Sequence, residues 1–545
     1  MAEGVGNRMR QPGHAGTQAP FSRTLFELLQ EQAQNHGTAV ISDGQTVTYA
    51  ALADRARKAA GMLHASGIRR GDRVGLLINN RIEWLEVAFG AWLLGAIATP
   101  FTTWCTRQEL EFLLQDSAVS ALVSLARFGR EDYAAMIAGL VASGTCPQLR
   151  QVWMLPDGPS SSEAAFPDYA TARDAAPPRP TPAPGDGPSA ADDAIILYTS
   201  GSTSRPKAIA LAHYLVIENG FNIGERQGLG PTDRVLLSPP LFWTYGGVNA
   251  LPATFTHGAA LVLQPRFEPG EALDLIERHQ CTSIYTLPGM TAAMIAHPEF
   301  RAERTRTLRV GMTIGSPQDV INAAEILGAA GMCNVYGSSE TGGNCCVTHH
   351  DWPLERRANS QGLPLPGVEI RIVDETTAEP LGPMQPGLVE VRGPYVMRGY
   401  TASSAVHNEA AFAPGGWFSS GDIGQLTEAG EFVFLGRSTE MIKRAGINVS
   451  PAEVEDILLQ HPAVGQAGVV GVPGPNGETI VAFVVPRDNR VPTSAELREH
   501  CRTTASSYKV PDRFEIVREL PATVTGKVMR KELKAAAARL APQEA

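Results

Sequence analysis

Three apolar, strand-like runs in this chain each end in a loop of small polar residues. They cover residues 195–198, 308–314 and 334–336, and segments with helical spacing, such as 50–66 and 81–94, alternate with runs of this kind. Alternation of strand and helix predicts α/β layers with parallel strands. Open α/β sheets bind ligands beyond the carboxyl ends of their strands. The pattern therefore predicts both the fold class and the general location of a ligand site.

The loop after residue 198 carries groups that suit an anion. It combines short hydroxyl side chains, one glycine and a terminal cation, namely Thr199, Ser200, Gly201, Ser202, Thr203 and Lys207. Backbone N–H groups and hydroxyls can wrap an anion, and lysine adds charge, so a polyphosphate is expected here. The order is not that of a Walker A loop, and Pro206 removes a backbone donor. On composition alone, an ordinary Ser/Thr-rich surface loop is an equal alternative.

Composition limits the partners and the compartment. The chain has 545 residues, is 43% hydrophobic and carries a net charge of −10. Broad binding to nucleic acid or to an anionic membrane is therefore not expected. The seven cysteines lack Cys-x-x-Cys spacing, as is typical of a reducing cytosol. The longest apolar run, residues 87–98, is too short to span a bilayer, and no signal core or terminal Ser-Lys-Leu is present. We expect a cytoplasmic protein without an integral membrane segment.

The chain is predicted to divide into a large and a small domain. Residues 1–20 are polar and are expected to form a disordered tail. Residues 21–437 are expected to form the large N-terminal domain of layered α/β subdomains, with a Pro-rich exposed loop at 159–193. Residues 438–545 are mixed in character and locally basic, which predicts a small α+β domain joined at 436–440.

Further motifs follow the phosphate-loop candidate in a definite order. They are Gly315-Ser316-Pro317, Tyr336-Gly337-Ser338-Ser339-Glu340, Ser420-Gly421-Asp422, Gly436-Arg437, the stretch 446–453 and the stretch 521–527. In this order they resemble the adenylate-forming superfamily, which includes acyl- and aryl-CoA synthetases, adenylation domains and beetle luciferases. One such match is weak evidence, but this many in order argue against chance. The resemblance covers nearly the whole chain after residue 20 and implies a mobile C-terminal domain.

The resemblance implies a chemical role for each motif. A carboxylate must attack the α-phosphorus of ATP, so the site must neutralise and align two anions. Lys527 would lie between these anions, Glu340 would hold Mg²⁺, and Ser339 keeps the hydroxyl of the family's threonine. Asp422 and Arg437 would bind the ribose. The remaining nucleotide contacts would be Thr199, Ser200, Gly201, Ser202, Thr203, Lys207, Gly315, Ser316, Pro317, Tyr336 and Gly337.

Plainer interpretations of the same residues remain open. Lys527 can be a solvated lysine, Glu340 a glutamate in the first turn of a helix, Asp422 a structural cap and Tyr336 a core tyrosine. Two substitutions in and beside the phosphate loop depart from the family pattern, in addition to those at Ser339 and Thr439. Ser204 stands where the phosphate loop usually has glycine, and Ala208 replaces another. If residue 204 requires a positive φ, serine there costs about 1 kcal/mol or more.

The second half-reaction implied by the resemblance uses CoA. After pyrophosphate leaves, the small domain would rotate about a hinge and present the loop at Gly446 to the CoA thiol. Thr439 occupies the hinge position, where the family usually has Asp or Lys, and Lys443 follows it. Trp243 stands where the family often has a histidine or aromatic residue near the acyl carboxylate. The acyl pocket is expected to draw its walls and space from Trp243, Tyr245, Gly246, Gly247, Met312, Gly342 and Gly343.

The favoured function is a free-standing acyl-CoA synthetase that uses ATP, Mg²⁺ and CoA. Phe242 and Trp243 offer no Asp to pair with an amino-acid ammonium, and no carrier-protein domain follows residue 545. The alternatives are a ligase that loads a separate carrier protein and a nucleotide-binding pseudoenzyme. The acid is expected to be bulky and apolar, either alicyclic or aromatic. The sequence leaves a homodimer open.

Overall fold

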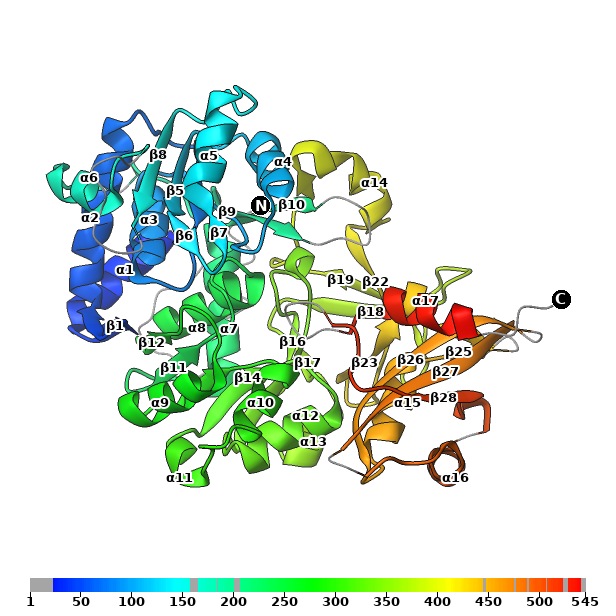
Figure 1. The fold of residues 1–545 in the computed structure, drawn as a ribbon. Coiled ribbons are helices and arrows are strands. Elements are labelled where there is room, and N and C mark those ends of the chain that lie inside the picture. The colour runs from blue at the N-terminus through cyan, green and yellow to red at the C-terminus, as the bar shows by residue number, and fades with distance from the viewer. Residues whose placement is uncertain are drawn as a thin grey trace.

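The chain builds a large N-terminal part with a smaller C-terminal part beside it, coloured orange to red in Figure 1. The computed structural model describes residues 23–156, 165–183, 185–199, 206–444, 447–474, 477–487, 490–505, 507–522 and 528–540. The predicted disordered tail, residues 1–20, lies outside the described residues. Within the described ranges, no helix combines the length and apolar character that crossing a membrane requires.

Two large sheets dominate the N-terminal part. Across the described residues, the first has the order β17 (Leu363–Pro364), β16 (Cys346–Val347), β15 (Gly331–Tyr336), β14 (Val310–Thr313), β13 (Ser283–Tyr285), β11 (Arg234–Leu237), β12 (Ala260–Leu263), β1 (Thr38–Ser42) and β2 (Gln45–Thr48). The second has the order β20 (Tyr400–Thr401), β10 (Lys207–Ala212), β9 (Asp193–Thr199), β4 (Ile97–Pro100), β3 (Arg73–Leu77), β5 (Ala121–Leu125) and β8 (Gln151–Leu155). The inner neighbours are parallel in both sheets, as predicted.

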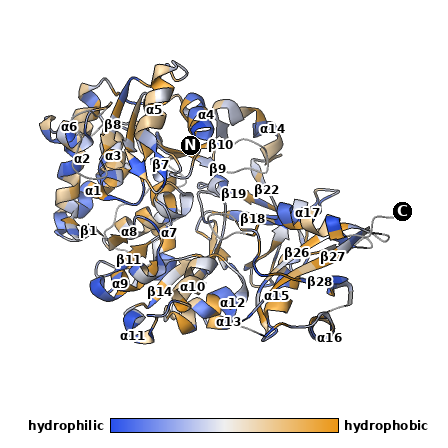
Figure 2. Ribbon diagram, viewed as in Figure 1, coloured by the Kyte–Doolittle hydropathy of each residue, from blue (hydrophilic) through white to orange (hydrophobic). Residues whose placement is uncertain are grey.

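Helices fill and cover the two sheets. The N-terminal part contains α1 (Leu25–Gln32), α2 (Tyr49–Ala65), α3 (Ile82–Leu93), α4 (Arg107–Ser117), α5 (Tyr133–Ala142), α6 (Tyr169–Ala175), α7 (His213–Gln227), α8 (Leu251–Thr256), α9 (Pro269–His279), α10 (Pro288–Ile295), α11 (Ala302–Thr305), α12 (Pro317–Ile321), α13 (Leu354–Ala358) and α14 (Asn408–Ala411). Helix α7 contacts β9 and β10 of one sheet and β14 and β15 of the other, so it lies between them. Figure 2 shows the strands lined with hydrophobic residues and hydrophilic residues on outer helices such as α4.

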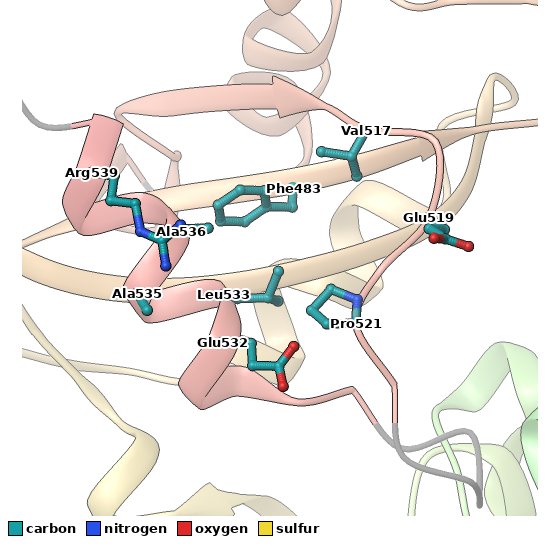
Figure 3. A pocket seen from close by; sticks show the side chains of 9 residues that line it. All are labelled: Phe483, Val517, Glu519, Pro521, Glu532, Leu533, Ala535, Ala536 and Arg539. Carbon is teal, nitrogen blue, oxygen red and sulfur yellow. The ribbon is translucent and has the colours of Figure 1, made fainter.

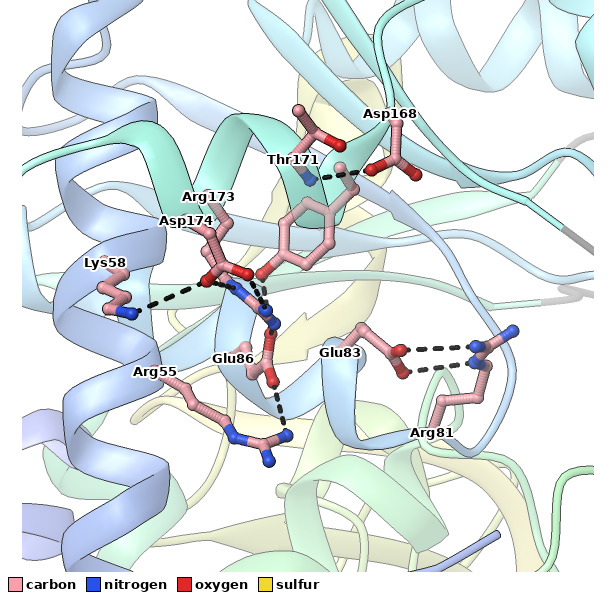
Figure 4. A network of polar contacts seen from close by, with 10 residues as sticks. Arg55, Lys58, Arg81, Glu83, Glu86, Asp168, Thr171, Arg173 and Asp174 are labelled. Atoms are coloured by element: carbon pink, nitrogen blue, oxygen red, sulfur yellow. Dashed lines mark hydrogen bonds and ion pairs between the residues drawn. The ribbon is translucent and has the colours of Figure 1, made fainter. Parts of the chain in front are cut away.

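Helix α6 corrects the prediction of an exposed loop over residues 159–193. Its Arg173 and Tyr169 reach the fully buried carboxylate of Glu86 on α3, at 2.6 and 3.1 Å, and Arg55 of α2 lies 3.2 Å from the same group. Figure 4 shows Arg55, Glu86 and Arg173 converging from three helices. A buried carboxylate is tolerated only when paired in this way. The Pro- and Ala-rich composition suggested a loop because it does not reveal this long-range pairing.

A third, antiparallel sheet completes the N-terminal part. Its strands are β18 (Glu369–Val373), β19 (Gly387–Arg392), β22 (Trp417–Leu426), β21 (Phe412–Ala413) and β23 (Phe432–Arg437), while β6 (Arg127–Phe128) and β7 (Glu131–Asp132) form a separate small ribbon. Strand β23 ends at Arg437, and the short helical turn η7 (Ser438–Glu440) leads into the C-terminal part.

The C-terminal part is a mixed α+β unit, as predicted. Its strands are β25 (Ile447–Val449), β24 (Ile442–Arg444), β27 (Gly477–Pro486), β26 (Val464–Gly474) and β28 (Arg513–Ile516), and its helices are α15 (Pro451–Leu459), α16 (Ser494–Thr504) and α17 (Arg530–Leu540). One core cluster includes Val469 and Ile480 with residues of α15 and α16, and another includes Phe483 with Leu533 of α17. Helix α15 also contacts β23, so the two parts meet beside η7.

Candidate active site

One cavity of about 880 Å³ gathers half of the described residues that the sequence marked for chemistry, while Tyr336 and Asp422 lie beside it, outside its lining. Its walls come from the ends of β9 and β15, from β22 and β23, and from η7. The predicted residues in its lining are Thr199, Lys207, Trp243, Tyr245, Gly337, Ser339, Glu340, Gly343, Arg437 and Thr439. Loops separated by up to 240 positions in the chain therefore face one space.

Lys207 and Glu340 are joined by a residue that the sequence analysis missed. The Lys207 Nζ lies 4.8 Å from the ring centroid of Tyr400, and the Tyr400 hydroxyl donates to Glu340 Oε1 at 3.0 Å. Burial raises the pKa of Tyr400, and the neighbouring Glu340 raises it further. Tyr400 belongs to β20, which pairs with β10 immediately after the phosphate loop. No local pattern in the sequence marks that pairing.

Ser339 and Glu340 are held in the short turn η5 (Ser339–Thr341) that follows β15. The backbone N–H of Met397 donates to the Glu340 carbonyl at 2.7 Å. The Ser339 and Thr244 hydroxyl oxygens lie 2.5 Å apart, and Thr244 begins the π-helical turn η3 (Thr244–Ala250). Thr244 also lines the cavity and was not singled out from the sequence.

Asp422 is the centre of a paired polar group at one end of the site. Its carboxylate is 3% exposed, accepts the Tyr336 hydroxyl at 2.7 Å and lies 2.9 Å from Arg437 Nε. Residues 422 and 437 face each other in the β22–β23 register. Burial raises the pKa of Tyr336, and the Asp422 charge adds to the effect. The Tyr336 ring packs on Phe434, with centroids 5.9 Å apart and planes inclined by 28°.

The predicted adenine-wall segment approaches the cavity through its neighbour Ile314. Ile314 is 45% exposed and lines the cavity, whereas Gly315, Ser316 and Pro317 do not. Ser316 instead caps α12, because its N–H donates to Asp319 Oδ2 at 2.9 Å and its hydroxyl accepts from the Asp319 N–H.

Asp319 also faces the C-terminal part of the molecule. Burial raises the pKa of Asp456 on α15 to about 7, and the charge of Asp319 adds to this shift. The pKa of Asp319 is itself raised by burial, and hydrogen bonds from Ser316 oppose that shift. Two carboxyl groups with raised pKa values thus lie at the contact between the two parts of the molecule.

Some of the residues predicted for the acyl pocket have other roles. A β-carbon at Gly246 would lie 2.2 Å from the Pro240 carbonyl oxygen, and one at Gly247 would lie 2.3 Å from that of Leu241. These two glycines permit close backbone packing and do not line the cavity, which corrects the prediction that they leave room for the acid. Gly342 and Met312 are also outside its lining, although the Met312 carbonyl accepts the Tyr245 hydroxyl at 2.8 Å.

The aromatic corner separates this cavity from a neighbouring one of about 400 Å³. Phe242 and Trp243 line both spaces, and Trp104 packs edge-on against each, with its ring centroid 5.2 Å from that of Trp243. A change in the Trp243 rotamer would therefore alter both cavities.

Several predicted residues lie outside the described part of the chain, namely Ser200, Gly201, Ser202, Thr203, Ser204, Gly446 and Lys527. The described chain ends at Ala522 before Lys527 and resumes at Val528 after it. Ala522 and Val528 pair antiparallel, and the Met529 N–H donates to the Pro521 carbonyl at 2.8 Å. The Lys443 side chain is exposed on β24, while its N–H donates to Glu478 at 2.7 Å.

A further cavity of about 370 Å³ lies inside the C-terminal part. Figure 3 shows Leu533 and Ala536 of α17 facing Phe483 of β27 and Val517, with Glu532 and Glu519 beside them. Among the described residues, none of those predicted for the reaction lines it.

The chain belongs to the family described as AMP-binding enzyme. The profile of that family matches residues 29–401, and the profile of the AMP-binding enzyme C-terminal domain matches residues 453–527. The motif-based prediction of an adenylate-forming enzyme, with a large N-terminal and a smaller C-terminal domain, is confirmed.

Similar proteins agree on the reaction type and differ in the acid. A feruloyl-CoA synthase from an Amycolatopsis species is 32% identical over 504 residues, covering 92% of this chain and 96% of the relative. A sulfoacetate–CoA ligase from Cupriavidus necator is 30% identical over 491 residues, covering 90% and 92%. The crystal structure of the anthranilate CoA ligase AuaEII with anthranoyl-AMP has a TM-score of 0.83 at 26% identity, covering 96% of this chain and 99% of that one. The chain is thus an ATP-dependent ligase of the acyl-CoA synthetase type, in a family that uses ATP and CoA.

Proposed function

We propose that this ligase activates a bulky apolar carboxylic acid, alicyclic or aromatic, and transfers it to CoA. The acid and ATP give an acyl-adenylate and pyrophosphate, and CoA then releases AMP and yields the thioester. The observation that carries the proposal is the single cavity of about 880 Å³, which joins Lys207, Glu340 and Arg437 to the aromatic corner at Trp243. A space of that size accommodates a nucleotide together with a large acyl group.

The nucleotide would lie along the polar end of the cavity. Lys207 and Thr199 would hold its phosphates with the remainder of the phosphate loop, since cations and hydroxyls suit phosphate oxygens. Asp422 would accept the ribose hydroxyls while Arg437, 2.9 Å away, orients that carboxylate. The Tyr336 ring, backed by Phe434, would lie beside the adenine.

Glu340 is the residue best suited to hold Mg²⁺. Its carboxylate lines the cavity, and Tyr400 orients it through Oε1. The described residues contain no cluster of three or more metal-ligating side chains, so substrate phosphates would supply further oxygens. Mg²⁺ is commonly bound in this way, by one or two carboxylates and the phosphates of a nucleotide. When bound, the ion would neutralise phosphate charge.

Lys527 would neutralise the two anions that meet in the first half-reaction. We assign residues 21–437 to the large domain and 438–545 to the small one, with Thr439 at the hinge. Rotation about this hinge would then withdraw Lys527 and bring Gly446, with Lys443 nearby, toward CoA. The two half-reactions would therefore use one cavity in succession.

Mass spectrometry of products from a panel of carboxylic acids tests the proposal. Each acid is incubated with ATP and Mg²⁺, with and without CoA. We expect AMP, pyrophosphate and an acyl-CoA that forms only with CoA, and best with a bulky apolar acid. A clear preference for acetate or propionate contradicts the proposed acid class. Acyl-adenylate that persists with CoA favours a separate carrier protein as the acceptor, and neither product despite ATP binding favours a pseudoenzyme.

The division of labour is tested with Lys527→Ala. This variant should lose adenylation by about 100-fold or more, because no other cation would lie between the reacting anions. Thioester formation from a supplied acyl-adenylate should change less than about threefold, since Lys527 is withdrawn at that stage. Lys531→Ala, four residues later on α17, is the control. Equal loss of both half-reactions in Lys527→Ala would refute the assignment.

A further inference from the structure

Three asparagines form a buried relay beside the cavity. Asn219 of α7, Asn249 of η3 and Asn344 after η5 are 0%, 1% and 2% exposed. The Asn249 Nδ2 donates to Asn219 Oδ1 at 3.0 Å, and the Asn219 Nδ2 donates to the Asn344 carbonyl at 2.7 Å. Asn249 and Asn344 also line the 880 Å³ cavity. Buried amides in an otherwise apolar setting are retained only where their hydrogen bonds are satisfied.

Two side-chain atoms of these asparagines are not used in the relay. Asn249 Oδ1 and Asn344 Nδ2 have no hydrogen-bond partner among the residues that the structure describes. One is an acceptor and the other a donor. They come from residues on either side of Gly343, which lines the same cavity, and a β-carbon on Gly343 would lie 2.2 Å from Asn249 Oδ1. Such a β-carbon would also lie 2.4 Å from Asn249 Nδ2, so the whole amide packs against the Gly343 backbone in the cavity wall.

The orientation of the Asn249 amide follows from its neighbours. Its Nδ2 faces two acceptors, Asn219 Oδ1 and the Gly342 carbonyl, each at 3.0 Å. Flipping the amide would place an oxygen against both acceptors, so Oδ1 is the atom left without a partner. The Asn344 side chain is free of the relay, because only its backbone oxygen takes part.

We infer that these two amides bind a hydroxyl group carried by the acid, away from its carboxylate. A hydroxyl both donates and accepts, so it would donate to Asn249 Oδ1 and accept from Asn344 Nδ2. This inference rests on the proposed function and narrows its substrate class to a bulky acid with an apolar body and one hydroxyl. A site built to hydrogen-bond a hydroxyl rejects analogues that lack it far more strongly than an apolar pocket rejects a size change.

Matched pairs of acids test the substrate class on the unmodified enzyme. In each pair a methyl group replaces the hydroxyl, as in para-hydroxybenzoate and para-methylbenzoate, para-hydroxycinnamate and para-methylcinnamate, and omega-hydroxyhexanoate and heptanoate. We expect at least one pair to show a preference of about 100-fold in kcat/KM for the hydroxyl acid. Equal or reversed preference in every pair would overturn the inference and would mean that an ordered water satisfies the two amides.

Asn344→Leu tests the assigned residues. It removes the unpartnered donor and keeps the relay, so the hydroxyl preference should fall to about tenfold or less while the methyl acid is used at least as well. Asn249→Leu should abolish the preference. Asn222→Leu is the control, because Asn222 is a buried amide of α7 that donates to Glu218 and Tyr395 and is outside the cavity lining. It should lower stability and leave the preference unchanged. A preference that survives in both Asn344→Leu and Asn249→Leu would overturn the assignment.

The two proposals fail in different ways. Because the readout is a ratio between two acids, a partly unfolded variant lowers both terms and leaves the ratio intact. Acyl-CoA formed from every acid without a hydroxyl preference contradicts only the inference about the amides. Absence of acyl-CoA from every acid contradicts the proposed function itself.

Discussion

The two ends of the cavity differ in whether their polar side chains have partners within the protein. At the proposed nucleotide end, the Asp422 carboxylate contacts Tyr336 and Arg437, and the Glu340 carboxylate accepts a hydrogen bond from Tyr400. At the proposed acyl end, one side-chain atom of Asn249 and one of Asn344 have no hydrogen-bond partner among the described residues.

The difference indicates where the enzyme is preorganised. Groups that contact one another before the substrate arrives lose little freedom on binding, which favours affinity for a constant ligand such as ATP. Polar groups without a partner in the protein favour discrimination among acids, because only an acid that forms the missing hydrogen bonds satisfies them. We expect changes at the nucleotide end to alter the rate with all acids and changes at the acyl end to alter the choice among acids.

The largest effect should come from breaking the Asp422 pair. Asp422→Ala leaves Arg437 and the Tyr336 hydroxyl without their shared partner. Arg437 is 44% exposed, so its ion pair is screened and contributes little. The main loss is of the proposed hydrogen bonds from the ribose hydroxyls to a charged group, each worth roughly 1.5–3 kcal/mol, which corresponds to about a 100-fold loss in kcat/KM for ATP. The loss should be the same for every acid tested, as measured by pyrophosphate release. If Asp422→Ala changed the preference among acids instead, the proposed difference between the two ends of the cavity would be contradicted.

A smaller effect should follow from Tyr400→Phe. The variant keeps the ring beside Lys207 and removes the hydrogen bond to Glu340. A hydrogen bond to a charged group contributes roughly 1.5–3 kcal/mol, so the Mg²⁺ concentration for half-maximal rate should rise about tenfold.

Tyr395→Phe is the matched control for that measurement. Tyr395 is a buried tyrosine whose hydroxyl donates to the Pro366 carbonyl at 2.8 Å and is not part of the cavity lining. It should lower the melting temperature with an unchanged Mg²⁺ requirement. An equal shift in both variants would show that Tyr400 acts only through stability.

The smallest effect concerns Asp456, whose pKa is raised by burial and by the nearby charge of Asp319. The pKa of Asp456 is raised to about 7 in the folded protein, so stability should fall as the pH rises from about 4 to 7 and then level off. Asp456→Asn resembles the protonated form. It should stabilise the protein on the order of 1 kcal/mol at about pH 8.5, about half as much at about pH 5.5 and least near about pH 4, as measured by urea unfolding. A gain that is independent of pH would contradict the assigned shift.

The sequence predicted those parts of the molecule that depend on patterns among neighbouring residues. The parallel strands, the antiparallel sheet and the α+β C-terminal part followed from periodicity, and the loops after residues 198 and 336 were placed at one site. Tyr400, Thr244 and Asn249 were missed because each acts through a partner far away in the chain. No spacing rule relates such residues.

The misjudged glycines have a different cause. Small residues serve two purposes, to open space for a ligand or to let two backbones approach, and a sequence does not distinguish them. Gly246 and Gly247 serve the second purpose, whereas Gly343 lines the cavity. Helix α6 was missed because the pairing of Arg173 with Glu86 outweighs a loop-like composition.

The close approach of Gly343 to Asn249 limits the mutational routes by which this enzyme can acquire new acids. Gly343 has a φ of +95°, so any side chain there is strained even after Asn249 is shortened. Substitution of Gly343 is therefore unfavourable both before and after a change at Asn249. We expect variants selected for other acids to accumulate changes at 249 and 344 while 343 stays glycine, so that adaptation proceeds by exchanging the amides rather than by reshaping the wall between them.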